Sequence, residues 1–297
     1  MQTVRNRVAD ILGIDLPIVQ APMNYIAGHA LAAAVSAAGG MGVLGPNAGK
    51  VQGEEISMRE RTLREFARIR EVTDKPVGIN VVVPDGENKA ALMYARSTVE
   101  AAAEGGATAA FCVGGLQPTI FELIKEKGMK LIVRPLTPTV KNAREAQAMG
   151  ADIFVATGYD AGGFLPSHHT GTFSIVPTIV DAVTIPVLAA GGINDLRGVR
   201  AAFALGAEGV YVGTRFIATN ECAANDHAKE LICKLSGSNL LYVDETQRSL
   251  PTEFAAEAYV KHRLAPTVPT TVDLVGALRT GMYDGEPDKG IVTVNTG

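Results

Sequence analysis

The sequence is poor in cysteine and in long hydrophobic runs, and it has no excess of positive charge. Its three cysteines, Cys112, Cys222 and Cys233, lie far apart, which argues against a zinc site or a disulfide framework and favours a reducing cytoplasm. The 27 basic and 31 acidic residues give a net charge of −4, so a basic surface for nucleic acid or membranes is not expected. No stretch reaches membrane-spanning length without charges, and the charged segment 1–13 is not expected to be a signal peptide. We therefore expect a cytoplasmic protein without nucleic-acid or membrane partners.

The 297 residues suffice for one barrel-sized domain or two smaller ones, and strand and helix patterns alternate along them. Strands are expected at 17–21, 42–44, 77–82, 109–113, 130–133, 153–157, 186–190 and 209–212. Helices are expected between them, at 29–38, 58–71, 88–104, 118–127, 140–149, 175–182 and 194–205.

Eight strands with seven intervening helices predict a single α/β domain, a (β/α)8 TIM barrel. The repeated unit in GGATAAF, MGADIFVATG and LGAEGVYVG supports this repeating architecture. No linker divides residues 1–297; we expect the barrel over about 14–235 and a C-terminal extension over about 236–297. Helices are expected near 222–235 and 253–262, and the tail is expected to pack across the barrel mouth or an oligomer interface.

Two glycine-containing turns follow the last two predicted strands. Gly191 and Gly192 end one strand, and Gly213 ends the next and precedes Thr214. In an eight-fold barrel the loops after strands seven and eight are the usual phosphate site, and glycine lets the backbone approach an anion closely. The alternative is that these glycines only make tight turns in a parallel α/β protein.

Other strand ends carry candidate ligand contacts. The first strand ends in Ala21, Pro22 and Met23, a short apolar loop that could lie flat against a planar ring system or be a plain turn. Asn80 is a polar residue inside an apolar strand, and at a barrel mouth its amide offers both a donor and an acceptor to a heterocycle.

Two further strand ends carry reactive or charged side chains. Cys112 has no activating histidine nearby in the sequence, so a buried structural thiol is favoured over a nucleophile. Arg134 could meet a flavin's anionic region or a substrate, or it could pair with a carboxylate at the rim.

The loop after the sixth strand holds Asp160, the pair Gly162-Gly163 and the adjacent His168 and His169. Adjacent histidines in an extended loop chelate one metal poorly and no carboxylate cluster accompanies them, so no metal site is expected. Histidine is the side chain best able to exchange a proton near neutral pH, and His169 is therefore the candidate catalytic residue. The alternative is a solvent-facing position at the rim.

With these residues in place, the sequence resembles the FMN-dependent nitronate monooxygenases, once called 2-nitropropane dioxygenases. The family's barrel is shared by NAD(P)H:quinone reductases and type II enoyl-ACP reductases. The resemblance covers nearly the whole chain through PIVQAPM, AAAVSAAGGMGVLG, GIN, MGADIFVATGYDAGG, HTGTFSIVP, IPVLAAGGI and LGAEGVYVGTRF, in family order.

The resemblance implies a TIM barrel that binds FMN non-covalently. The residues it places around FMN are Ala21, Pro22 and Met23 beside the isoalloxazine, Asn80 hydrogen-bonded to the flavin, and Gly191, Gly192, Gly213 and Thr214 at the phosphate.

The catalytic loop departs from the family pattern Glu-Ala-Gly-Gly-His-x-Gly. Asp160 replaces the glutamate, and Phe164 stands where the histidine is expected, whereas the run from His169 to Phe173 restores the His-x-Gly-Thr-Phe sequence. One interpretation is a short insertion over 164–168 that moves the histidine along the loop. The other is that the family histidine is lost and His169 is incidental.

The leading hypothesis is an FMN-dependent monooxygenase that oxidises alkyl nitronates with O2. The nearest alternative is an NAD(P)H-dependent reductase of quinones or enoyl thioesters, and a third is a flavin-binding protein without turnover. A small-molecule substrate is expected in each enzymatic case. The use of NAD(P)H and the formation of a homodimer are left open.

Overall fold

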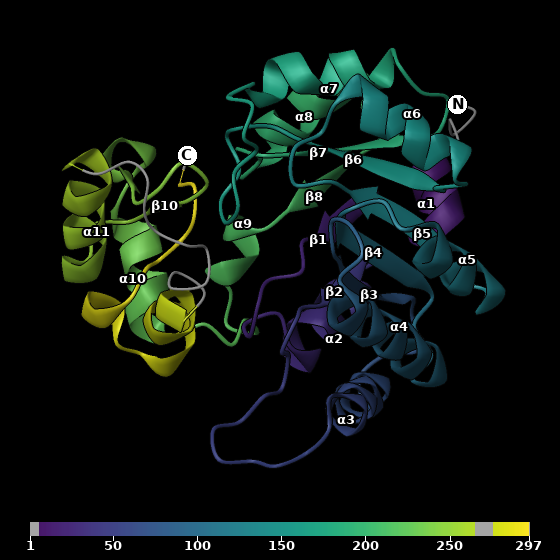
Figure 1. The fold of residues 1–297 in the computed structure, drawn as a ribbon, viewed down its shortest axis with the longest axis horizontal. Coiled ribbons are helices and arrows are strands. Elements are labelled where there is room, and N and C mark those ends of the chain that lie inside the picture. Colours follow the sequence, from purple (N-terminus) through teal and green to yellow (C-terminus); the bar gives the residue numbers. More distant parts are fainter. Residues whose placement is uncertain (1–5, 265–275, 297) are drawn as a thin grey trace.

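The computed structural model describes residues 6–264 and 276–296, and eight parallel strands within them form a barrel (Figure 1). The strands pair in chain order from β2 to β8, and β8 pairs with β1. The ring closes where Val19 of β1 pairs with Met41, one residue before β2. Their bounds are β1 (Ile18–Gln20), β2 (Gly42–Leu44), β3 (Val77–Val83), β4 (Ala109–Gly114), β5 (Lys130–Arg134), β6 (Ile153–Thr157), β7 (Val187–Ala190) and β8 (Gly209–Val212). The predicted TIM barrel is confirmed.

Helices surround this ring and connect successive strands. They are α2 (His29–Ala37), α3 (Met58–Arg70), α4 (Lys89–Glu104), α5 (Pro118–Glu126), α6 (Val140–Ala148), α7 (Thr172–Val180) and α8 (Leu196–Ala204). Side-chain caps fix several of the starts: Ser57 accepts from the backbone N–H of Glu60, and Thr139 accepts from that of Asn142.

Two helix starts differ from the sequence-based expectation because of such contacts. Helix α7 begins at Thr172 rather than 175, since the Asp160 carboxylate accepts the Thr172 backbone N–H at 2.6 Å. Helix α8 begins at Leu196 rather than 194, because Asp195 is the N-cap and accepts from the backbone N–H of Arg197.

A helix that the periodicity did not predict, α1 (Arg7–Leu12), contributes to the barrel interior at its N-terminal end. Its Val8 and Leu12 join the interior side chains of the strands, among them Phe111, Ile132 and Ile153. Neighbouring strand residues point the other way and pack under the helices, as period-two alternation requires. The barrel is therefore filled with side chains at the N-terminal ends of its strands, and the open space lies at their C-terminal ends.

The chain after β8 builds a second packed region beside the barrel mouth (Figure 1). It contains α9 (Thr214–Ile217), α10 (Asp226–Lys234), β9 (Leu241–Tyr242), β10 (Arg248–Ser249), α11 (Glu253–Leu264) and the π-helical turn η2 (Thr280–Asp284). Ile232 of α10 packs in one cluster with Leu31 of α2 and with Val292 near the chain end. Because α10 packs against both parts, the expected division near residue 235 stays a prediction.

The described C-terminal residues, 291–296, return to the barrel mouth. The backbone N–H of Asn295 donates to the Thr214 hydroxyl at 3.3 Å, and the Asn295 side chain donates to the carbonyl of Asp160. Of the two locations that the sequence left open for the tail, its described part occupies the barrel mouth.

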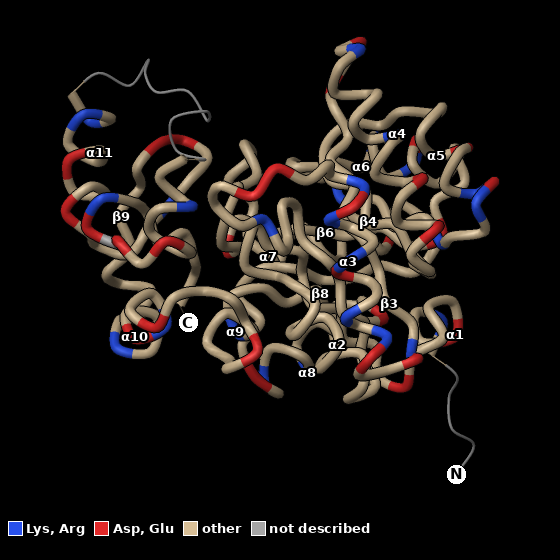
Figure 2. The backbone as a smooth tube through the Cα atoms, turned by 90° about the horizontal axis from the view of Figure 1, so that it is seen from below, with Lys and Arg blue, Asp and Glu red and all other residues tan. Residues whose placement is uncertain are grey.

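Acidic and basic residues are interspersed along the outer helices and loops, and few lie on the barrel strands (Figure 2). Within residues 6–264 and 276–296, no helix is long and apolar enough to cross a membrane.

Candidate functional site

A cavity of about 940 Å³ opens at the C-terminal end of the barrel, and the ends of all eight strands line it. Parallel strands in a ring bring their carboxyl ends to one face, so residues far apart in the sequence meet there. The eight residues predicted to bind a cofactor all line this cavity: Ala21, Pro22, Met23, Asn80, Gly191, Gly192, Gly213 and Thr214.

The turns after β7 and β8 form a cradle of small residues. Gly191 and Gly192 have φ of 110° and 69°, a region that side-chain-bearing residues rarely adopt. Gly213 has an ordinary φ, and an added Cβ there would come no closer than 3.7 Å to Ala21 and 4.0 Å to the Met23 sulfur. At Gly213 the missing side chain therefore keeps open the space that the cavity occupies.

The wall beside this cradle, at the end of β1, is apolar, and amide side chains lie further round the ring. Ala21, Pro22 and Met23 follow β1, and Asn80 lies on β3 with 5% of its surface exposed. The Asn80 side-chain NH2 group donates to the carbonyl of Phe111 at 3.0 Å. Its amide oxygen has no partner among the described residues, so it is available to a ligand.

Arg134, at the end of β5, is a cation in the cavity wall. Its guanidinium makes no ion pair or hydrogen bond with any residue of the described chain, so the rim carboxylate considered from the sequence is not its partner. Burial lowers the pKa of the Arg134 guanidinium, and the neighbouring Tyr211 partly opposes this shift. Burial also raises the pKa of the Tyr211 hydroxyl. Arginine keeps its proton in proteins, so this wall presents a positive charge beside a protonated phenol.

His169 does not line the cavity. Its side chain is exposed, and its ring centroid lies 4.4 Å from that of Tyr159. Phe164 lines the cavity instead and pairs with Gln247 in an isolated antiparallel bridge. In this arrangement the loop turns an apolar ring toward the ligand space and the imidazole away from it, and the catalytic role of His169 stays a prediction.

Three buried polar atoms in the cavity wall have no hydrogen-bond partner among the residues that the structure describes: the hydroxyls of Thr157 and Thr293 and the side-chain carbonyl oxygen of Gln247. Buried polar atoms of this kind normally have partners, so these point to a ligand that bears its own polar groups. Together with the glycine cradle and the apolar wall, they fit a flat heterocycle attached to an anionic group.

Sequence reasoning missed the residues that the C-terminal region contributes, namely Gln247, Leu278, Met282, Thr293 and Asn295. They lie where the strand and helix pattern loosens, and no motif or spacing marks them. Only the path of the chain back to the barrel mouth places them in the wall.

The remaining reactive groups lie apart from the ligand space. Cys112 is 1% exposed and burial raises the pKa of its thiol, so it is a core side chain in the protonated form. Among the described residues, no three His, Cys, Asp or Glu side chains lie close enough together to hold a metal ion.

Comparisons with known proteins agree with this geometry. The family model described as nitronate monooxygenase matches residues 5–297. A probable nitronate monooxygenase from Staphylococcus saprophyticus is 29% identical, over 92% of this chain and 86% of its own length. The structure of FabK from Thermotoga maritima superimposes with a TM-score of 0.83 at 32% identity, over 99% of this chain and 89% of that one.

A further relative carries a different name. A (3aS,4S,5R,7aS)-5-hydroxy-7a-methyl-1-oxo-octahydro-1H-indene-4-carboxyl-CoA dehydrogenase from Rhodococcus jostii is 34% identical over 77% of this chain. The match spans only 60% of that relative's length.

Proposed function

The chain belongs to the nitronate monooxygenase family, and from this membership and its cavity we propose that it is an FMN-dependent oxidoreductase that oxidises alkyl nitronates with O2. The observation that carries the proposal is the convergence of three features on one cavity. They are the glycine cradle after β7 and β8, the apolar wall after β1 and the unpaired guanidinium of Arg134.

In this proposal Gly191, Gly192, Gly213 and Thr214 hold the FMN phosphate, and Ala21 to Met23 pack against the isoalloxazine. The Asn80 amide oxygen and the unpartnered atoms of Thr157, Gln247 and Thr293 are the acceptors and donors available to the ring and the ribityl chain. When bound, the flavin supplies one-electron oxidation of the substrate with dioxygen as the final acceptor.

The unpaired Arg134 supports an anionic substrate. A nitronate is an anion before it binds, so its oxidation needs no proton abstraction, and the guanidinium supplies charge stabilisation and orientation. In the balanced reaction, two nitronate anions and one dioxygen molecule give two carbonyl compounds and two nitrite ions. This division of work suits a cavity whose β6 loop presents Phe164 rather than an imidazole.

The test supplies the purified protein with FMN and an alkyl nitronate and follows oxygen consumption together with nitrite release. We expect nitronate-dependent oxygen uptake, and we expect Arg134→Gln to raise KM for the nitronate by about 10-fold or more, because the charge that binds the anion is lost. The matched control is Arg144→Gln, since Arg144 lies on α6, away from the cavity, and its side chain donates to the carbonyl of Ala182. Absence of nitronate-dependent oxygen uptake would remove this proposal.

The second candidate is an NAD(P)H-dependent reductase of quinones or enoyl thioesters. Its specific support is the cavity volume, about 940 Å³, which lies near the upper end of the roughly 300–1,000 Å³ usual for small-molecule sites and leaves room beside a flavin. The similarity to the FabK structure and to the carboxyl-CoA dehydrogenase from Rhodococcus jostii is consistent with it. Rapid anaerobic bleaching of the flavin by NADH or NADPH, followed by reoxidation with an electron-poor acceptor, would favour it over the monooxygenase. A protein that holds flavin and turns over none of these substrates would match the third candidate.

A further inference from the structure

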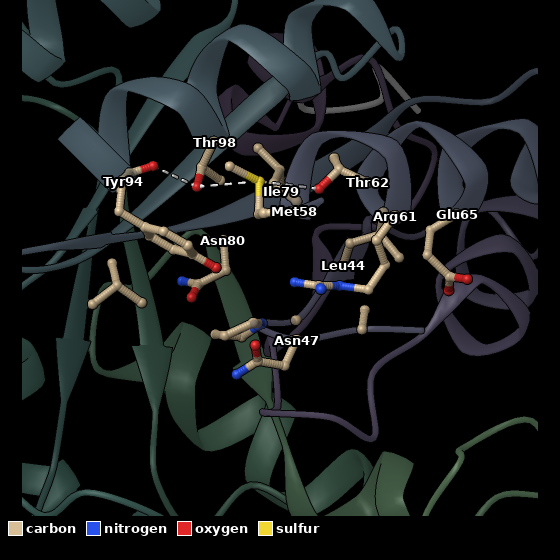
Figure 3. A pocket seen from close by; sticks show the side chains of 14 residues that line it. Leu44, Asn47, Met58, Arg61, Thr62, Glu65, Ile79, Asn80, Tyr94 and Thr98 are labelled. Atoms are coloured by element: carbon tan, nitrogen blue, oxygen red, sulfur yellow. Dashed lines mark hydrogen bonds between the residues drawn. The ribbon is translucent and has the colours of Figure 1, made fainter. Parts of the chain in front are cut away.

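A second, much smaller cavity lies beside the main one, between the ends of β2 and β3 and the helices α3 and α4 (Figure 3). Its volume is about 30 Å³, and Asn47, Asn80 and Tyr94 belong to the walls of both cavities. A cavity needs about 10–15 Å³ of volume, measured as the space open to the centre of a water-sized sphere, to hold one water molecule. The side pocket therefore has room for a small polar group or ion and little more.

Arg61 of α3 is buried in the wall of this pocket, with 9% of its surface exposed. Its guanidinium extends from the helix toward Asn47 and Asn80 (Figure 3). It makes no hydrogen bond and no ion pair with any described residue. Arginine stays protonated, so a full positive charge sits at this place with no carboxylate bound to it.

Glu65, which also lines the pocket, and Glu54 are both engaged by other groups. The Glu65 carboxylate, one turn along α3, accepts from the backbone N–H of His29 at 3.0 Å, contacts the His29 ring at 3.0 Å and reaches Arg68 at 3.4 Å. Glu54 pairs with Arg64, and this hydrogen bond is the main cause of its lowered pKa, to which the charge of Arg61 adds least. Neither carboxylate lies within ion-pair distance of Arg61.

The side chain facing Arg61 is also a donor. The Tyr94 hydroxyl points toward the guanidinium across the space beside Asn80 (Figure 3), and it has no hydrogen-bond partner among the described residues. The rest of the wall includes the apolar side chains of Leu44, Met58 and Ile79. Two donors around a small, partly apolar space match a compact anion, because the anion compensates the charge and accepts both hydrogen bonds.

We propose that the pocket between Arg61 and Tyr94 binds a small monovalent anion of the size of a halide or nitrite. The pocket is too small for a phosphate ester or an acyl chain, and a single negative charge neutralises the one guanidinium. The proposal does not depend on the proposed reaction. Nitrite is included because it is the anion that oxidation of a nitronate releases, and chloride because it is abundant.

The direct test is crystallographic. Crystals of the purified protein are soaked in sodium bromide, and anomalous scattering locates bromide. We expect a peak within hydrogen-bond distance of the Arg61 guanidinium in the wild type and no such peak in Arg61→Gln. A wild-type crystal with bromide at other sites and none beside Arg61 would overturn the proposal, whether or not the variant folds.

The solution test compares thermal unfolding in sodium bromide, sodium nitrite and sodium gluconate at equal ionic strength, since gluconate is a monoanion too large for the pocket. Relative to gluconate, we expect bromide or nitrite to raise the wild-type Tm by about 2–4 °C more than that of Arg61→Gln. Arg59→Gln is the matched control, because Arg59 lies on the same helix with its exposed guanidinium paired to Glu104. It should keep the wild-type response. An equal rise in Tm for Arg61→Gln and Arg59→Gln would contradict the proposal. The relative affinities of bromide and nitrite would identify the preferred anion.

Discussion

At the scale of single residues, Phe164 lines the cavity at the position where the family pattern has a histidine. The imidazole of His169 packs on Tyr159, and the guanidinium of Arg248 lies 5.1 Å from the same tyrosine ring. For His169 to act on a substrate, the loop must turn its ring away from Tyr159 and into the cavity. A catalytic role for His169 therefore requires a loop rearrangement as well as the right side chain.

The histidine prediction is tested by His169→Ala, with His168→Ala as the matched control because His168 is the adjacent exposed imidazole. If His169 transfers a proton, its loss lowers kcat/KM by about 100-fold or more, while the control keeps wild-type activity. Steady-state kinetics with neutral nitroalkanes measure the effect, whereas activity with nitronates, which need no proton abstraction, should change little. Indistinguishable activities for the two variants would show that His169 is incidental.

Thr293 allows a sharper test of the cavity wall, because its buried hydroxyl has no hydrogen-bond partner in the described part of the chain. Thr293→Val should leave the stability of the ligand-free protein unchanged or slightly higher, and should weaken flavin binding by about 3- to 10-fold. Thr296→Val is the control, since that hydroxyl is also buried without a partner but does not line the cavity. Fluorescence titration with FMN measures both. Equal affinities in the two variants would place the Thr293 hydroxyl outside the flavin site.

At the scale of elements, strand ends supply the ligand contacts, and caps decide where the helices begin. Ser57 and Glu60 form a reciprocal capping box at the start of α3, the helix that carries Arg61. The hydroxyl and then the backbone N–H of Ser57 lower the pKa of the Glu60 carboxyl. The pKa of Glu60 is lower in the folded protein than in the unfolded chain, so its hydrogen bonds with Ser57 stabilise the fold at pH values above the ordinary glutamate pKa. This stabilisation is lost as the pH falls through the lowered value.

We expect Ser57→Ala to lower the free energy of unfolding by about 1 kcal/mol at neutral pH, because the first turn of α3 loses its cap. Urea unfolding measures the change, which should shrink in acid as Glu60 becomes protonated. Ser97→Ala is the control, since Ser97 is an exposed residue inside α4. A loss as large in Ser97→Ala as in Ser57→Ala would mean that capping is not the cause.

At the scale of the whole molecule, the ligand space is shared between the barrel and the C-terminal region. Strand ends form most of the wall, and Gln247, Met282, Thr293 and Asn295 come from the chain beyond β8. A ligand in this space contacts both parts, so its binding free energy stabilises their association as well as the barrel itself.

Removal of the flavin tests this coupling. At FMN concentrations about 100 times Kd, binding adds about 2.7 kcal/mol, and we expect the flavin-free protein to unfold about 5–10 °C lower. Hydrogen exchange should then increase at residues 241–249 and 291–296 as well as at the β7 and β8 turns. Added FMN should restore the Tm of the flavin-free protein more effectively than added FAD. A colourless preparation whose Tm does not respond to FMN would contradict flavin binding.

The barrel was predictable because its signals are local. Every predicted strand lies within about two residues of an observed one, since a short apolar run that ends near a glycine or a proline marks each of them in the sequence. Strand ends meet at one face of any such ring, so Asn80 and Gly213 could be assigned to one site without knowing a single contact. Helix boundaries were less certain where a distant side chain, such as Asp160 at α7, supplies the cap.

By itself, then, the sequence determined the order of strands and helices, the barrel, and the residues at its strand ends, because each depends on a short stretch of chain. Only the tertiary structure decided which way His169 faces and that Gln247 and Thr293 complete the cavity wall. It also decided that Arg61 lines a pocket with Asn80 and pairs with none of the described residues. These features arise from contacts between segments far apart in the sequence. No local pattern encodes them, because the packing of the C-terminal region and of the loops sets their positions.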